Sequence, residues 1–160
     1  MYQTDFQKII EFNNAFGVTT HTTPQLNLFD KDPKLVAYRL ALVQEEFDEL
    51  QEAIKTKDFI EVLDALCDIQ YVVLGFYTAI GLDADRAFDI VHKSNMSKLC
   101  KTEQEAHESV NIYLEERPQR YDSPAYRKAD DNVHWVVYNQ NTKKILKSHK
   151  YTPANFDSLM

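Results

Sequence analysis

The chain has 160 residues, of which 44% are hydrophobic, and a formal net charge of -7. This length suits one ordinary hydrophobic core with a small appendage rather than two full domains. The acidic balance and the scattered Lys and Arg residues argue against a nucleic-acid-binding surface, because phosphate backbones require clustered cations. A cation-dependent site fits the composition better.

The cysteines and the hydropathy pattern favour a reduced, cytoplasmic protein. Cys67 and Cys100 lie far apart in the sequence, without the ligand spacing of a zinc site or the pattern of a disulfide framework. The first ten residues lack the basic and apolar regions of a signal peptide. The longest apolar run, residues 69–82, is too short to span a bilayer. We therefore expect no membrane segment.

Capping signals and apolar periodicity predict a mainly α-helical chain. A T-x-x-Q capping box at Thr4 opens a first helix, and Asp32 followed by a proline opens a second. Gly17 and Gly81 are suited to close helices in the left-handed conformation. The third helix is almost entirely apolar, which predicts that it is buried. The expected helices cover residues 4–17, 32–57, 58–81, 83–99 and 102–117, with a loop at residues 18–31.

The pattern changes after the last expected helix. HWVVY (134–138) and KKILKS (143–148) read as two short strands around a polar turn. We therefore predict a mainly α multi-helix bundle with a small C-terminal β-hairpin appendage. Residues 1–100 would form the helical core, and residues 101–160 an extension of unknown role. The 3 glycines form no Gly-rich phosphate loop, so any phosphate chemistry must use a metal instead.

Acidic side chains concentrate on the second and third expected helices. Positions three and four apart share a helix face, so Glu46 and Glu49 point the same way. Glu61, Asp64 and Asp68 line one stripe of the next helix, and the last two stand among apolar residues. A solvated face with local ion pairs explains an isolated acidic run. However, no Lys or Arg lies in the third helix to neutralise its acids.

Carboxylate ligands without histidine or thiolate suit Mg²⁺, or alternatively Mn²⁺. A di-iron bundle would need paired Glu-x-x-His motifs, and this chain has only one related pair, Asp89 with His92. Near the end of the fourth expected helix, Lys93, Asn95 and Lys98 have two explanations. They complement the helix dipole, or they hold the outer oxygens of a polyphosphate next to the metal site.

Four segments together resemble the all-α nucleoside triphosphate pyrophosphohydrolase superfamily: EExxEL (45–50), DALCDIQY (64–71), GLD (81–83) and KSNMSK (93–98). This superfamily includes the MazG proteins, the dimeric dUTPases and the phosphoribosyl-ATP pyrophosphohydrolases, and the last branch is the most similar. The resemblance covers roughly residues 1–100. It implies a helical bundle that forms homodimers or homotetramers. It also implies Mg²⁺-dependent hydrolysis of a nucleotide between the α and β phosphates, releasing a nucleoside monophosphate and pyrophosphate.

Matched position by position, the resemblance implies roles for individual acids. Glu46 and Glu49 match the metal ligands of the first motif, and Asp68 matches the aspartate of the second. Glu45 matches a further acid that orients or deprotonates the attacking water. Lys98 and its neighbours would stabilise the charge on pyrophosphate.

The second motif departs from the usual ExxD pattern of the superfamily, because Ala65 stands three residues before Asp68. We expect Asp64, one residue earlier, to substitute as the ligand, with Glu61 as a secondary candidate. The departure also permits a different class of function. The alternative is a catalytically inactive helical interaction or scaffold protein that retains the bundle.

Overall fold

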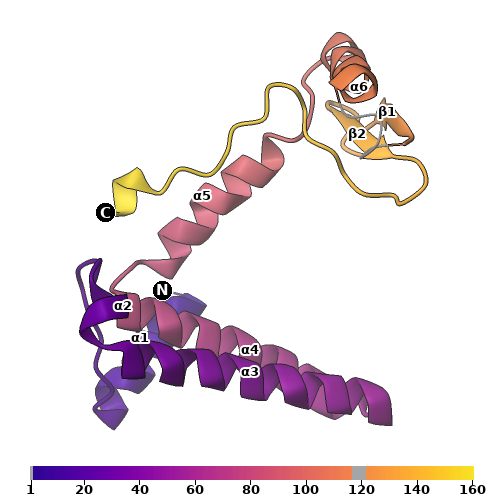
Figure 1. Cartoon of the computed structure of the whole chain (residues 1–160). Helices are drawn as coiled ribbons and strands as arrows, with labels where there is room; N and C mark the ends of the chain where they lie inside the picture. Colours follow the sequence, from indigo (N-terminus) through magenta and orange to yellow (C-terminus); the bar gives the residue numbers. More distant parts are fainter. Residues whose placement is uncertain (1, 117–121) are drawn as a thin grey trace. The chain divides into compact units, whose positions relative to one another are not determined.

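The computed structural model is mainly helical, with a small antiparallel sheet near the C-terminus (Figure 1). It describes residues 2–116 and 122–160. The predicted fold class is confirmed. The helices are α1 (Asp5–Phe16), α2 (Leu28–Lys31), α3 (Pro33–Thr56), α4 (Phe59–Ile80), α5 (Ala84–Met96) and α6 (Glu103–Glu116); the strands are β1 (Pro124–Lys128) and β2 (Trp135–Asn139), and a 3₁₀ helix, η1, covers Asp157–Leu159.

Local capping interactions explain where the first long helices begin and end. The Thr4 hydroxyl accepts from the Gln7 backbone N–H at 3.2 Å, and the Gln7 side chain accepts from the Thr4 backbone N–H at 3.0 Å. The side chains of Asp32 and Asp58 cap α3 and α4 in the same way. At the end of α4, Gly81 has φ of 74°, and a Cβ there would collide with the Thr23 carbonyl. These predicted boundaries are confirmed.

The predicted loop at residues 18–31 is partly wrong, because its last four residues form α2. Leu28 is buried, and the Asp32 N–H donates to its carbonyl at 2.9 Å. A single helical turn is too short to produce apolar periodicity in the sequence.

The predicted pairing of the C-terminal strands is also wrong in detail. The partner of β2 is β1, in the antiparallel register Pro124↔Asn139 to Lys128↔Trp135. The segment 143–148 forms only an isolated bridge, Tyr138↔Ile145. Lys143, the first residue of this segment, has φ of 61° and belongs to the turn that follows β2.

The prediction that the third helix is buried is wrong for the single chain. α3 and α4 run side by side, and α1 also contacts α4 (Figure 1), but large apolar side chains of α4 stay exposed. Phe59 is 77% exposed and Leu63 53% exposed. Packing within the helical unit therefore does not explain all of the apolar sequence of α4.

The chain divides into two compact units. The helical unit comprises Met1–Ala87 with Asp157–Met160, and the extension unit comprises Phe88–Phe156. In the extension unit, α6 packs on the two strands around a core of Cys100, Ala106, Val110, Val137 and Leu146. The functional division of the sequence near residue 100 stays a prediction. No helix in the described part of the chain is long and apolar enough to cross a membrane.

Candidate active site

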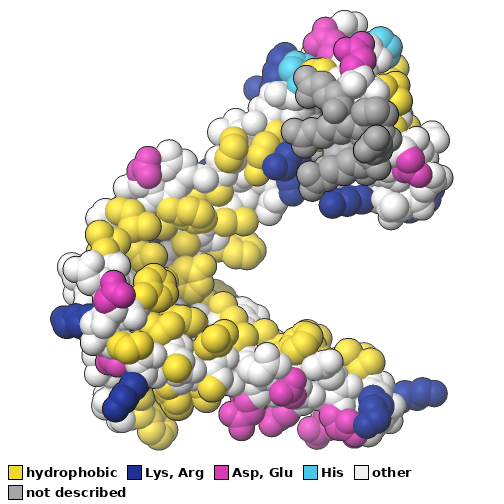
Figure 2. Space-filling view, in the orientation of Figure 1, with side chains coloured by type: hydrophobic (Ala, Val, Ile, Leu, Met, Phe, Trp, Pro, Cys, Tyr) yellow, Lys and Arg dark blue, Asp and Glu magenta, His cyan; other side chains and the backbone are white. Residues whose placement is uncertain are grey.

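Several of the predicted acids lie on the facing sides of α3 and α4. The two-residue connection between these helices makes them antiparallel neighbours. Glu46 on α3 and Asp68 on α4 are half-buried, whereas Glu45, Glu49 and Asp64 are exposed. Figure 2 shows acidic side chains gathered along this helix pair, beside hydrophobic side chains. The acids therefore form a cluster with a half-buried centre and an exposed rim.

The pKa of Glu46 is sensitive to the other acids of the helix pair. Burial raises the pKa of Glu46, and the negative charges of Asp68, Glu49, Glu45 and Asp64 raise it further, in that order. The structure thus places Glu45, Glu49, Asp64 and Asp68 within electrostatic reach of Glu46. Ionised carboxylates in such a cluster repel one another, and a bound cation would relieve the repulsion.

The secondary candidate Glu61 has a different environment. It is exposed in the first turn of α4, and its backbone N–H donates to the Asp58 carboxylate at 3.2 Å. At this position the helix dipole and water both stabilise a negative charge. Glu61 therefore needs no cation, in contrast to the carboxylates around Glu46.

The chemistry of the donor set fits Mg²⁺, because carboxylate oxygens are its preferred protein ligands. Glu46, Glu49, Asp64 and Asp68 are the residues that could hold it. As the side chains lie, no three His, Cys, Asp or Glu groups among the described residues form a ready-made metal site. Repulsion between like charges favours this spread arrangement, and the exposed rim leaves side chains free to change rotamer.

The predicted substrate-binding residues belong to the extension unit, whereas the acids belong to the helical unit. Lys98 donates a hydrogen bond from its Nζ to the Asn95 Oδ1 at 2.7 Å. Lys93 lines a cavity of about 300 Å³ between the C-terminal half of α5 and residues 152–155. The structure therefore joins Asn95 to Lys98 and places Lys93 at a separate opening.

The C-terminal segment packs along the same part of α5. The Thr152 carbonyl accepts hydrogen bonds from the Ser94 and Ser97 hydroxyls at 2.9 and 3.3 Å, and the Ser148 N–H donates to the Lys98 carbonyl at 3.2 Å. These contacts were not predicted. Ser94 in the last turn of α5 and Ser97 just after the helix are their signal in the sequence. The extension is thereby anchored on the helix end that carries the predicted phosphate-binding residues.

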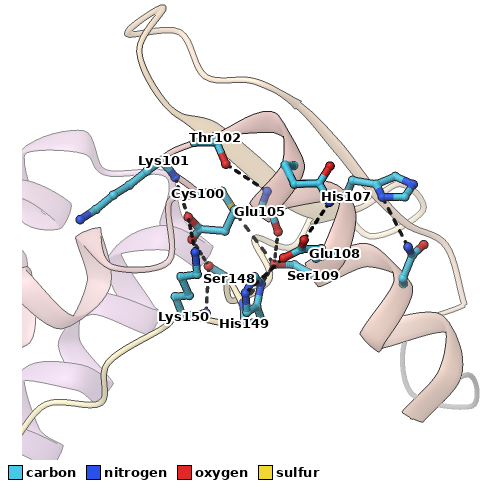
Figure 3. Close-up of polar contacts among 12 residues, drawn as sticks. Cys100, Lys101, Thr102, Glu105, His107, Glu108, Ser109, Ser148, His149 and Lys150 are labelled. Carbon is cyan, nitrogen blue, oxygen red and sulfur yellow. Dashed lines mark hydrogen bonds and ion pairs between the residues drawn. The ribbon is translucent and has the colours of Figure 1, made fainter.

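A buried carboxylate organises the extension unit (Figure 3). Glu105 Oε1 accepts from the Ser148 hydroxyl at 2.5 Å, and Oε2 accepts from the Lys101 N–H at 3.2 Å, with Lys150 Nζ at 3.8 Å. Burial would raise the pKa of Glu105, but the hydrogen bonds from Ser148 and Lys101 and the nearby charges of Lys150 and His149 lower it overall. Glu105 therefore serves as an ionised structural anchor.

The same region contains Ser109, His149 and Glu108 in an order that resembles a hydrolase triad (Figure 3). Ser109 Oγ lies 3.0 Å from His149 Nδ1, and His149 Nε2 lies 3.6 Å from Glu108. However, Ser109 is only 1% exposed, and its hydroxyl donates to the Glu105 carbonyl at 2.7 Å. A substrate cannot reach this oxygen, so the group ties residues 148–150 to α6 rather than acting as a nucleophile.

Comparisons with known proteins identify what the helical part of the chain is similar to. A family model described as phosphoribosyl-ATP pyrophosphohydrolase matches residues 9–95, more than half of the chain. The matched stretch contains α3 and α4 with all the clustered carboxylates. An uncharacterized protein of Acanthamoeba polyphaga mimivirus is 29% identical, and the match covers 98% of this chain and 96% of the viral protein. The region after residue 100 is therefore part of that similarity.

Proposed function

The chain belongs to the phosphoribosyl-ATP pyrophosphohydrolase family, within the MazG-like all-α superfamily, and from that premise we propose that it is a Mg²⁺-dependent nucleotide pyrophosphohydrolase. The reaction cleaves a nucleoside triphosphate or a related nucleotide between its α and β phosphates. The products are a nucleoside monophosphate and pyrophosphate. A cytoplasmic role in maintaining the nucleotide pool fits this chemistry.

One observation carries the proposal: Glu46 is half-buried between α3 and α4, where burial raises its pKa and the charges of four other acids raise it further. Clustering like charges at a helix interface is unfavourable for folding, and a perturbed carboxyl in such a cluster is typical of a functional site. A donor set made only of carboxylate oxygens suits Mg²⁺, or alternatively Mn²⁺, better than ions that prefer imidazole or thiolate ligands.

The residues then take separate roles. Glu46, Glu49, Asp64 and Asp68 hold the metal, which when bound supplies Lewis-acid polarisation of the phosphates and lowers the pKa of a bound water. Glu45, on the exposed rim, orients or deprotonates the attacking water. Lys93, Asn95 and Lys98 bind the outer phosphate oxygens and stabilise charge on the leaving pyrophosphate.

The test is release of pyrophosphate and nucleoside monophosphate from a panel of nucleotides, with Mg²⁺ and with EDTA. Glu49→Gln removes one ligand charge without changing the size of the side chain, and we expect it to abolish the Mg²⁺-dependent turnover. Glu52→Gln is the matched control, because Glu52 lies on the same helix, is exposed, and pairs with Lys55 at 2.9 Å. Wild-type activity in the Glu49 variant would exclude the assigned site.

The alternative is a catalytically inactive helical interaction protein. It is favoured by Ala65, which stands where the superfamily usually has a glutamate. The same assay decides between the two functions, because an interaction protein releases no pyrophosphate from any nucleotide at any Mg²⁺ concentration.

We also propose that the protein forms a homodimer or homotetramer through the outer face of α3 and α4. This face carries large exposed apolar side chains, among them Leu40, Ile54, Phe59, Ile60, Leu63 and Leu66. A face of this kind is typical of a surface covered in the assembled protein. In such an assembly, a second copy of the chain would bury these side chains, as the apolar sequence of α4 predicts.

A further inference from the structure

Arg39 is the one buried charged residue of α3, and it is not among the site residues predicted from the sequence. Only 8% of the residue is exposed. Its guanidinium lies against Gly75 of α4, so that a Cβ on Gly75 would be 3.0 Å from Arg39 Nη1. The arginine therefore occupies the space that a side chain would take on the opposite helix.

Gly75 itself is explained by this contact. It lies inside α4 without a positive φ, where glycine destabilises a helix relative to alanine. The helix is held behind it: the Thr78 hydroxyl donates to the Gly75 carbonyl at 2.7 Å, and Asn13 Nδ2 donates to Thr78 Oγ1 at 2.9 Å. These hydrogen bonds fix the backbone of α4 at the position against which the guanidinium lies.

The Arg39 guanidinium has no counter-ion in the described part of the chain. The Nε atom of Arg39 is buried and has no hydrogen-bond partner. Within residues 2–116 and 122–160, no carboxylate pairs with Arg39 at ion-pair distance. A guanidinium stays protonated at any accessible pH, so the protein cannot remove this cost by losing a proton. Nε is the only guanidinium nitrogen of Arg39 that is both buried and unpartnered, so its Nη atoms reach the surface, where an anion from outside the chain can bind them.

The register of the two helices places Arg39 near the candidate active site, where a bound nucleotide would provide the anion. Arg39 precedes Glu46 by seven residues, and Gly75 follows Asp68 by seven, so both pairs share a face two turns apart. Two turns correspond to about 10 Å along the helix axis. A polyphosphate and the long arginine side chain together span this distance.

We propose that Arg39 is a substrate-binding residue whose guanidinium binds non-bridging phosphate oxygens of the nucleotide. The inference rests on the proposed function, and it adds a cation from the same unit as the carboxylates. Guanidinium groups bind phosphate through paired N–H donors, which a lysine ammonium cannot reproduce. Arg39 would then hold the anion while Gly75 keeps the guanidinium in place.

The test measures binding of inorganic pyrophosphate to the full-length protein by calorimetry, with and without Mg²⁺. We expect Arg39→Met to weaken binding at least tenfold and Arg39→Lys to weaken it less. Lys34→Met is the matched control, since Lys34 is exposed on the same helix, and it should bind like the wild type. The melting temperature of ligand-free Arg39→Met should equal or exceed that of the wild type, because an unpaired buried charge is removed.

Gly75→Ala provides a second test that does not depend on removing the arginine. The added Cβ displaces the guanidinium, whereas alanine favours the helix. Pyrophosphate affinity should fall without a lower melting temperature. Wild-type affinity in both variants, or no pyrophosphate binding by the wild-type protein, would overturn the inference. A change from oligomer to monomer in Arg39→Met would also overturn it, by assigning the counter-ion to a second copy of the chain.

Failure of this inference is distinguishable from failure of the proposed function. If nucleotides are hydrolysed but Arg39→Met changes neither KM nor pyrophosphate affinity, the arginine is structural and the enzyme assignment stands. If no nucleotide is hydrolysed but pyrophosphate binding still requires Arg39, the anion site stands and the hydrolase assignment does not.

Discussion

Glu46 of α3 and Asp68 of α4 are half-buried carboxylates that repel each other across the helix pair. Burial contributes most to the raised pKa of Glu46, and Asp68 contributes most among the charged neighbours. A carboxyl whose pKa is raised by folding destabilises the folded protein when it is ionised. This penalty is complete above the raised pKa and disappears as the pH falls below the ordinary value of 4.5.

Glu46→Gln should therefore stabilise the metal-free protein at pH 7, by roughly 0.5 kcal/mol, the scale of like-charge repulsion on helices. Chemical denaturation in EDTA measures the effect, and the difference from the wild type should vanish at pH 4. Added Mg²⁺ should stabilise the wild type more than the variant, because binding to the native state adds stability. Glu52→Gln is the control on the same helix. Lower stability of Glu46→Gln at pH 7 would contradict the repulsion.

The second prediction ranks Asp64 against Glu61. Asp64 is one of the charges that raise the pKa of Glu46, whereas Glu61 lies in the first turn of α4 beside the Asp58 cap. Asp64→Asn should reduce turnover at saturating Mg²⁺ by roughly 10² or more, the usual effect of removing a charge-stabilising group. Glu61→Gln should have a much smaller effect. The opposite ranking would move the second metal-binding motif to Glu61 and Asp64 and leave Asp68 in a supporting role.

The third prediction concerns self-association through α4. Leu63 is 53% exposed on this helix, and a charge at this position would be buried if a second copy covers the face. Leu63→Glu should weaken association at least about tenfold, equivalent to about 1.4 kcal/mol. Sedimentation velocity at tens of micromolar measures the change. Leu26→Glu, at an exposed leucine outside α3 and α4, is the control. A wild-type monomer under these conditions would refute the proposed assembly.

The helix boundaries were predictable because their causes are local. Thr4, Asp32 and Asp58 each accept a hydrogen bond from a backbone N–H within three residues, so the sequence pattern and the interaction coincide. The partners of β2 in β1 lie seven to fifteen positions away, from Lys128↔Trp135 to Pro124↔Asn139, and the sequence of β1 has no clear alternation. A strand without alternation is poorly encoded in a short segment, because strand preference depends on the surroundings of each side chain.

The carboxylates of the site were predictable from helical spacing together with their apolar surroundings. The same reasoning missed Arg39, since an arginine on an amphipathic helix is normally solvated. Its burial follows from the antiparallel register of α3 and α4, which places Gly75 opposite it. A single glycine in an apolar helix does not reveal that it faces a cation. The contact between Arg39 and Gly75 is therefore visible only once the register of α3 and α4 is known.

The last prediction tests whether Glu105 anchors the extension unit as an ionised group. The Glu105 carboxylate accepts hydrogen bonds from the Ser148 hydroxyl and from the Lys101 N–H. In a glutamine one of the two oxygens becomes an NH₂ group, which cannot accept, so one of these two donors would lose its partner. Glu105→Gln should therefore cost about 1–3 kcal/mol of stability at pH 7. Because folding lowers the pKa of Glu105, its contribution is complete above the ordinary value of 4.5 and is lost as the pH falls through the lowered value. Denaturation curves at pH 7 and pH 3 should show a large difference from the wild type at the first and a smaller one at the second. Glu103→Gln, in the exposed first turn of α6, should match the wild type at both. Equal stability of Glu105→Gln and the wild type at pH 7 would show that the buried charge contributes nothing to the extension unit.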